Sequence, residues 1–372
     1  MNKKRDYFFA VCILFCIGLL LWFDRNKRFT QSEGDSKSPS PELTENTETY
    51  AMEIPASWKE EIDSYNRIDA TIVVPDCIRN KGFLRVNTKN KEVNYEDVLP
   101  LLEDYYHPRK TMEDERCIQY LGEDNMRLNF IKQNYEVLSL YSHFYDYVSM
   151  AYRDKLAEGY NRDCYPVDRD LESFTLNECD DRIMNLCKSI GIEGEIDIVH
   201  HTLDYRTMEA EAEELHEDGS RTKPDYYWSD ADSCYYCTFS QTCNGIPIIP
   251  NYNLQSSGDI INASEHICLL NKERFVSFRI GKIYDIQYEN EYEELMAFQN
   301  IVERYRKYAG MAKQDYETVI TDITMRVFMV NQGDGTYRAV PIWIFYGDVK
   351  FEGETWRGRQ VVFIDAMTGE ML

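Results

Sequence analysis

The sequence predicts an α+β protein in which one N-terminal transmembrane helix precedes helices packed on antiparallel sheets. Three observations predict this class: an uncharged apolar run near the N-terminus, a well-capped helix in mid-chain, and a C-terminal region of one helix followed by three alternating strands. The predicted organisation is a cytoplasmic head and anchor over residues 1–28, a tether over 29–54, a first α+β region over 55–230 and a C-terminal α+β domain over 231–372.

The predicted anchor is the run from Tyr7 to Phe23, which holds seventeen residues without a charge behind the basic residues 3–5. A helix of that length spans roughly 25 Å, against a hydrocarbon core of about 30 Å, so a short span fits. The basic head favours a cytoplasmic N-terminus, although further basic residues at 25–28 weaken this signal. Small residues favour contacts between helices in a bilayer, which makes Ala10 and Gly18, about two turns apart, the candidate contact with another span.

A cleaved signal peptide and a lipid attachment are the alternatives to a retained anchor. Cleavage requires small residues after the apolar run, where Trp22 and Phe23 stand. Lipid attachment requires a small residue before a cysteine at the end of the run, whereas Cys16 follows Phe15 in its middle. We therefore expect the run to be retained in the membrane.

Charge is distributed unevenly between the N-terminus and the rest of the chain. Residues 1–28 hold six of the 41 basic and two of the 65 acidic residues, so the remainder carries 35 against 63, a net charge of −28. A surface this acidic repels a phosphate backbone, which argues against nucleic-acid binding. The segment 29–54 is rich in Ser, Thr, Glu and Pro and nearly free of large apolar residues, so we expect a disordered spacer there.

The first α+β region is predicted to begin with a strand near Ile72–Val74 and a helix near Val98–Tyr106, and the aromatic-rich segment from Met126 to Tyr152 is predicted to form strands. A capping box at Thr175 and Glu178 then opens a helix that ends near Gly191. Five residues at helical spacing are expected to face the core: Cys179, Ile183, Leu186, Cys187 and Ile190.

Further elements follow from alternation and turn signals. We expect a strand at Ile196–Val199, with His200 and His201 on its solvent-facing and core-facing sides rather than paired as ligands, and a short acidic helix at Thr207–Leu215. A hairpin over 233–249 is predicted to turn at Asn244-Gly245. The last predicted elements are a strand at Arg274–Ile286, a helix over 292–309 that covers Trp343, and a meander of three strands at Thr318–Asn331, Arg338–Tyr346 and Gln360–Ala366.

The cysteines give the only candidate for metal or redox chemistry. Eleven are present and two lie in the apolar run, so the nine outside it cannot all pair within one chain. Cys234, Cys237 and Cys243 form the densest group, a candidate disulfide or thiol cluster. Zinc requires four ligands and a second CxxC is absent; a redox CxxC opens a helix, whereas this one lies in a predicted strand. We therefore expect structural disulfides or inert thiols at these positions, and assign no metal, cofactor or catalytic residue.

Other motifs for chemistry are absent from the sequence. Asp230-Ala-Asp232 begins like a calcium loop, but Tyr235 and Gln241 stand where an EF-hand requires Gly and Glu. No Gly-rich phosphate loop, GxSxG or HExxH is present. We expect a protein that is not an enzyme.

The C-terminal sheet resembles a known group of proteins. Val340-Pro-Ile-Trp343 and Ile364-Asp-Ala-Met-Thr-Gly369 are similar to the closing strands of PepSY-like domains and of the YycH/YycI-type regulatory proteins of Gram-positive bacteria. The resemblance implies a short N-terminal membrane helix, an extracytoplasmic α+β region and control of a membrane partner, which is a sensor kinase for YycH/YycI. The cysteine richness of this chain departs from that pattern.

The predicted function is accordingly that of a single-pass cell-membrane protein whose extracytoplasmic domain binds or regulates a membrane or cell-envelope protein without catalysis. The alternative is an extracytoplasmic thiol- or metal-dependent enzyme built around residues 234–243. A third possibility is a eukaryotic type II membrane protein, because Asn262-Ala-Ser264 is a glycosylation sequon.

Overall fold

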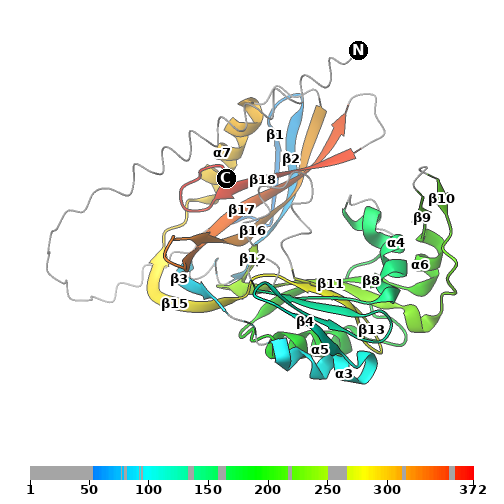
Figure 1. Cartoon of the computed structure of the whole chain (residues 1–372). Coiled ribbons are helices and arrows are strands. Elements are labelled where there is room, and N and C mark those ends of the chain that lie inside the picture. Colours follow the sequence, from blue (N-terminus) through cyan, green and yellow to red (C-terminus); the bar gives the residue numbers. More distant parts are fainter. Residues whose placement is uncertain are drawn as a thin grey trace, which may run out of the picture. The chain divides into compact units, whose positions relative to one another are not determined.

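The structure is a computed structural model that describes residues 53–76, 78, 82–91, 93, 95–132, 138–157, 165–216, 220–249, 266–311, 316–351 and 357–372. Residues Thr49–Leu372 form one compact unit (Figure 1). The predicted anchor, with Ala10 and Gly18, lies outside the described residues. Within the described ranges, no helix has both the length and the apolar character needed to cross a bilayer.

The described fold is α+β, as predicted, with most strands in one large sheet and five α-helices among the described residues. The helices are α3 (Pro100–Tyr106), α4 (His143–Ala157), α5 (Leu176–Ser189), α6 (Tyr205–Glu211) and α7 (Phe298–Met311), with short 3-10 helices at Tyr95–Val98 and Asp230–Asp232.

The C-terminal part of the sheet is built on the predicted meander. Strand β17 pairs antiparallel with β16 on one side and with β18 on the other, and β16 also pairs in parallel with β2. Helix α7 packs on one face of these strands (Figure 1). The strands of this part are β1 (Ser57–Glu61), β2 (Asn66–Val73), β3 (Phe83–Asn90), β15 (Tyr284–Glu293), β16 (Tyr316–Asn331), β17 (Thr336–Phe351) and β18 (Arg357–Asp365).

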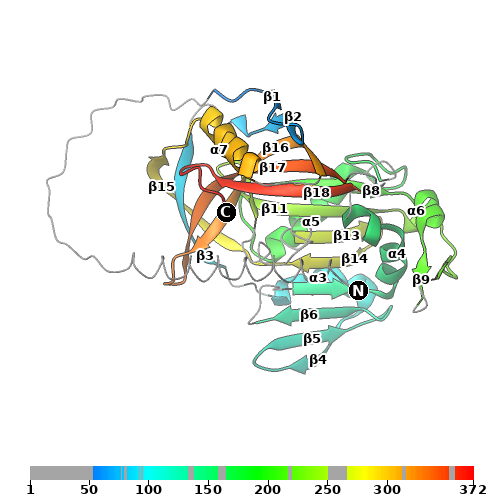
Figure 2. The same cartoon turned by 90° about the horizontal axis from the view of Figure 1, so that it is seen from above.

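The other part of the sheet is antiparallel throughout. Its order is β8-β11-β13-β14-β7-β6-β5-β4, and Figure 2 shows most of these strands side by side. The strands are β4 (Arg109–Glu113), β5 (Cys117–Leu121), β6 (Arg127–Ile131), β7 (Leu138–Tyr141), β8 (Ile196–Leu203), β11 (Cys234–Cys243), β13 (His266–Asn271) and β14 (Phe275–Ile280). A separate two-stranded ribbon joins β9 (Glu214–Leu215) to β10 (Arg221–Thr222).

The predicted hairpin joins the two parts of the sheet. Asn244 and Gly245 both have positive φ, as a tight hairpin turn requires, and the turn connects β11 to β12 (Ile246–Ile249). Strand β12 then pairs in parallel with β16. The predicted boundary between residues 230 and 231 does not separate the two parts, because β2 and β3 pair with β16 and β17.

Each part of the sheet has its own hydrophobic core, and α5, the helix with the predicted capping box, packs in the core of the antiparallel part. The Thr175 side chain accepts a bond from the Glu178 N–H, and the Glu178 carboxylate accepts one from the Thr175 N–H, which confirms the capping box. The five predicted core residues of α5 are all buried against one face of the antiparallel part. The opposite face is covered by α4 and α6.

Four predictions of elements need correction; one is the helix predicted over 292–309, which begins only at Phe298 because β15 continues to Glu293. The strands predicted up to Tyr152 end at Tyr141, after which α4 begins; its buried Phe144, Val148 and Ala151 follow helical spacing, which the aromatic content obscured. The strand predicted over Arg274–Ile286 is two strands, β14 and β15. The acidic helix is shorter than predicted and ends at Glu211.

Candidate functional site

The structure does not bring together Cys234, Cys237 and Cys243. Successive side chains of β11 point to opposite faces of the sheet, so Cys234 packs in the core under α4 and α6 while Cys237 packs in the core under α5. Cys243, at the end of β11, packs in neither of these two cores and lies instead in the core of the C-terminal part of the sheet. All three are buried free thiols.

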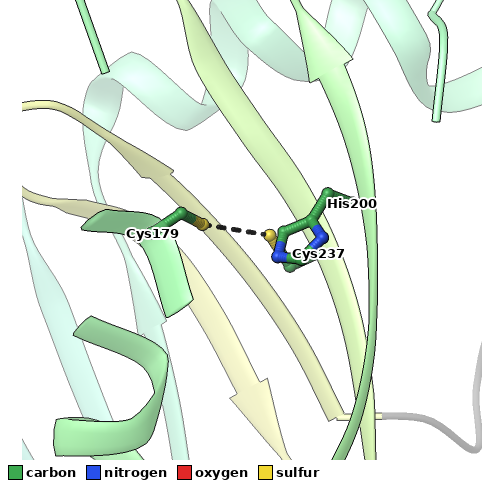
Figure 3. A group of neighbouring side chains, drawn as sticks. All are labelled: Cys179, His200 and Cys237. Atoms are coloured by element: carbon green, nitrogen blue, oxygen red, sulfur yellow. Dashed lines mark hydrogen bonds between the residues drawn. The ribbon is translucent and has the colours of Figure 1, made fainter. Parts of the chain in front are cut away.

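Cys237 instead meets one residue from α5 and one from β8. Its register partner on β8 is His200, so both side chains lie on the face that α5 covers. The capping box places Cys179 in the first turn of α5, facing the same point. The Cys179 and Cys237 Sγ atoms lie 3.6 Å apart, and the two sulfur atoms and a His200 ring nitrogen all lie within 4.8 Å of one another (Figure 3). Cys179, His200 and Cys237 are referred to below as the thiol–imidazole cluster.

Two carboxylates hold the imidazole of His200 in place. Asp168 Oδ1 lies 3.0 Å from Nδ1, and Asp180 Oδ1 lies 2.8 Å from Nε2. The backbone N–H of Asp168 also donates to the His200 carbonyl, which fixes the segment that carries this carboxylate beside β8. The neighbouring His201 lies on the opposite face, near the ring of Tyr236; the prediction of a solvent-facing histidine is wrong for His200, which is buried because α5 covers its face.

The surroundings shift the protonation of the cluster. The hydrogen bond with Cys237, together with the effect of His200, lowers the pKa of the Cys179 thiol to about 7 against the opposing effect of burial. Burial by itself lowers the pKa of His200, but hydrogen bonds with Cys179, Asp168 and Asp180 outweigh it and raise this pKa to about 9. Burial raises the pKa of Cys237 well above its usual value. The pKa shifts of Cys179 and His200 have opposite directions, and each favours the charged form of its group.

A pocket of about 540 Å³ opens beside the cluster, between the start of β8 and α5. Asp180, which contacts His200, forms part of its wall, together with the acidic residues Glu195 and Asp197. The side chain of Asp180 is 42% exposed, whereas that of His200 is 8% exposed. The pocket therefore connects solvent with the carboxylate nearest to the buried ring.

The arrangement fits some kinds of chemistry better than others. A reactive thiol is partly exposed, whereas Cys179 and Cys237 are both completely buried. A disulfide has its sulfur atoms about 2.05 Å apart, so the observed 3.6 Å separation is that of two reduced thiols. Two thiols and an imidazole converging on one point are typical ligands of a soft metal ion.

Sequence reasoning missed this site because its members are far apart in the chain. Helical spacing correctly placed Cys179 in the core, but the register that brings His200 opposite Cys237 depends on the pairing of β8 with β11. A search for close ligand spacing favoured Cys234 as the neighbour of Cys237, although the period of a strand places these two on opposite faces.

Comparisons with known proteins bear on the fold alone. No family model matches the sequence, and no curated protein matches it. A crystal structure of an uncharacterized protein from Eubacterium rectale is similar, with a TM-score of 0.59 and 14% sequence identity over 86% of this chain and 93% of that chain. At this identity the likeness shows that the two proteins share a fold across nearly the whole compact unit.

Proposed function

We propose that this protein is a single-pass membrane-anchored protein whose extracytoplasmic unit binds and regulates a partner in the membrane or cell envelope. The observation that carries the proposal is the order of segments: a basic head, the apolar run Tyr7–Phe23, a polar spacer over 29–54 and then one folded unit. Such a spacer lifts a folded unit away from a bilayer. The compact unit begins at Thr49, close to the predicted end of the spacer, which supports this division.

The resemblance of the C-terminal strands to PepSY-like and YycH/YycI-type proteins gives the proposal its class of partner. The residues that carry this resemblance lie on β17 and at the end of β18, beside α7. A sensor kinase or another component of the envelope machinery is therefore the partner class proposed.

The end of the sheet at β15 offers a surface suited to recognition. Within the described residues β15 is the last strand of the sheet order, so its outer edge is not paired with another strand. Tyr288 and Tyr292 on this strand are 51% and 49% exposed, and Glu289 and Glu291 lie between them. Tyrosine is enriched in protein interfaces, whereas the two glutamates already face Arg85, so the tyrosines are the recognition feature of this edge.

The alternative, a thiol- or metal-dependent enzyme, gains little support from the cysteines. The group over residues 234–243 is divided among three cores. The thiol–imidazole cluster resembles a nucleophile with a base, but its two sulfur atoms lie beneath α5 without exposure, where a substrate atom cannot reach them.

Topology is the first test of the proposal. Full-length protein is expressed in cells, membranes are isolated, and protease is added to intact cells before and after permeabilisation. We expect the chain in the membrane fraction and the unit Thr49–Leu372 degraded in intact cells. A chain recovered in the soluble fraction, or protected until permeabilisation, would overturn the proposal.

The role of the apolar run is tested separately by substitution. A flexible spacer transmits little rotation or push, so regulation through the membrane requires a contact of the span itself as well as tethering. We expect Gly18→Leu to weaken crosslinking between spans, and replacement of residues 7–23 by an unrelated span to abolish it. Full function with the unrelated span would show that the anchor is a passive tether.

A further inference from the structure

We propose that Cys179, His200 and Cys237 bind a zinc ion as three of its ligands. The site joins α5 to β8 and β11, and its role is structural. This inference is independent of the proposed function, because it rests on the geometry of the thiol–imidazole cluster alone.

The distances match a tetrahedral zinc ion. Two thiolates at about 2.3 Å from such an ion lie about 3.8 Å apart, close to the 3.6 Å between the Cys179 and Cys237 Sγ atoms. A His200 ring nitrogen shares the same point, since all three ligand atoms lie within 4.8 Å of one another (Figure 3). Three ligand atoms are thus gathered close to one point.

The imidazole of His200 is held as a zinc ligand requires. A ligating histidine usually donates its other ring N–H to a carboxylate, which fixes the tautomer. Asp168 lies 3.0 Å from Nδ1 and serves this purpose, so that Nε2 is the nitrogen left to bind the metal. Asp180 lies 2.8 Å from Nε2, so zinc at this nitrogen takes the place of the contact with Asp180.

The charges of the site also favour a divalent cation. Two thiolates and a neutral imidazole offset the charge of Zn²⁺, which makes the buried group neutral. Asp180, which contacts His200, also lines the neighbouring pocket together with Glu195 and Asp197, so the solvent side of the site is acidic.

The test uses the full-length chain, purified in detergent under reducing conditions, with metal content measured by mass spectrometry. We expect about one zinc per chain in the wild-type protein and a loss of it in Cys237→Ser. Cys234→Ser is the matched control, because Cys234 is an equally buried thiol three residues away on the same strand but on the opposite face. We expect this variant to retain its zinc.

A milder variant keeps the test decisive if Cys237→Ser does not fold. Asp168 is 60% exposed and acts as a positioning residue, so Asp168→Asn leaves the core intact. We expect it to weaken zinc affinity by about 10–100-fold, the usual effect of removing a partner of a ligating histidine, measured by competition with a coloured chelator. Cobalt substitution of the wild-type chain should give the absorption bands of a tetrahedral thiolate site.

Three results would overturn the proposal. One is a wild-type chain that holds no zinc as purified and takes up neither zinc nor cobalt. Another is peptide mapping that finds Cys179 and Cys237 joined in a disulfide in the wild-type protein. The last is an equal loss of zinc from Cys234→Ser and Cys237→Ser, which would place the metal elsewhere.

Discussion

Replacing Trp343 tests how the C-terminal part is held together. This side chain is completely buried at the centre of β17, and its ring meets the ring of Phe298 on α7 edge to face at 4.9 Å. Removing a buried tryptophan costs about 3–5 kcal/mol through lost burial and the cavity left behind. The indole N–H has no acceptor among the described residues, which costs the wild-type protein about 1–3 kcal/mol. Because the substitution also removes this unpaired N–H, part of the lost packing energy is offset. We therefore expect Trp343→Ala to lower the free energy of unfolding by about 3 kcal/mol, at the low end of the range.

The assay is urea unfolding of a fragment spanning residues 49–372, followed by circular dichroism. Trp343→Phe keeps an aromatic ring against α7 and removes the unpaired N–H, so it should cost less than about 1.5 kcal/mol. Trp58→Ala is the control: Trp58 contacts the same Phe298 at 5.8 Å but is only partly buried, and should cost about 1 kcal/mol. A Trp343→Ala variant within 0.5 kcal/mol of the wild type would refute this packing.

Two further perturbations address the sheet edge and a close backbone approach. Burial alone raises the pKa of Glu293, but hydrogen bonds from Arg85 and Arg338 outweigh it and hold this pKa below its usual 4.5. The carboxylate therefore stabilises the fold above pH 4.5, and this contribution is lost as the pH falls through the lowered pKa. Glu293→Gln should lower the free energy of unfolding by about 1–2 kcal/mol at pH 7 and by progressively less in acid. Urea unfolding at several pH values measures this difference. A Cβ at Gly122 would be driven against the backbone carbonyl of Tyr106, so Gly122→Ala should cost about 1–3 kcal/mol in the same assay.

The glutamate variant and the glycine variant each have a control variant of the same residue type. Glu289, on the same strand as Glu293, is more exposed, so Glu289→Gln should change stability little at any pH. An added Cβ at Gly310 in α7 meets nothing within 4 Å, so Gly310→Ala should stabilise the protein by about 0.5–1 kcal/mol. Equal effects of the two glutamate variants, or of the two glycine variants, would contradict the contacts described.

Local signals predicted the elements that depend on local physics. The capping box of α5 and the alternation of β16 and β17 are set by residues within a few positions of one another, and both were confirmed. Helix α4 was missed because its aromatic residues have strand propensity, while burial against α6 and β14 decides its conformation. The thiol–imidazole cluster was missed for a related reason, since it depends on the register of strands more than thirty residues apart.

Photo-crosslinking in intact cells tests the central claim of a membrane or envelope partner most directly. A photoreactive residue is placed at Tyr292, on the exposed edge of β15, and at Tyr65, which is similarly exposed in a turn before β2. The proposed function predicts a discrete adduct from Tyr292 with a membrane or cell-envelope protein, stronger than any from Tyr65. The same background from both positions, or adducts with cytoplasmic proteins alone, would contradict it.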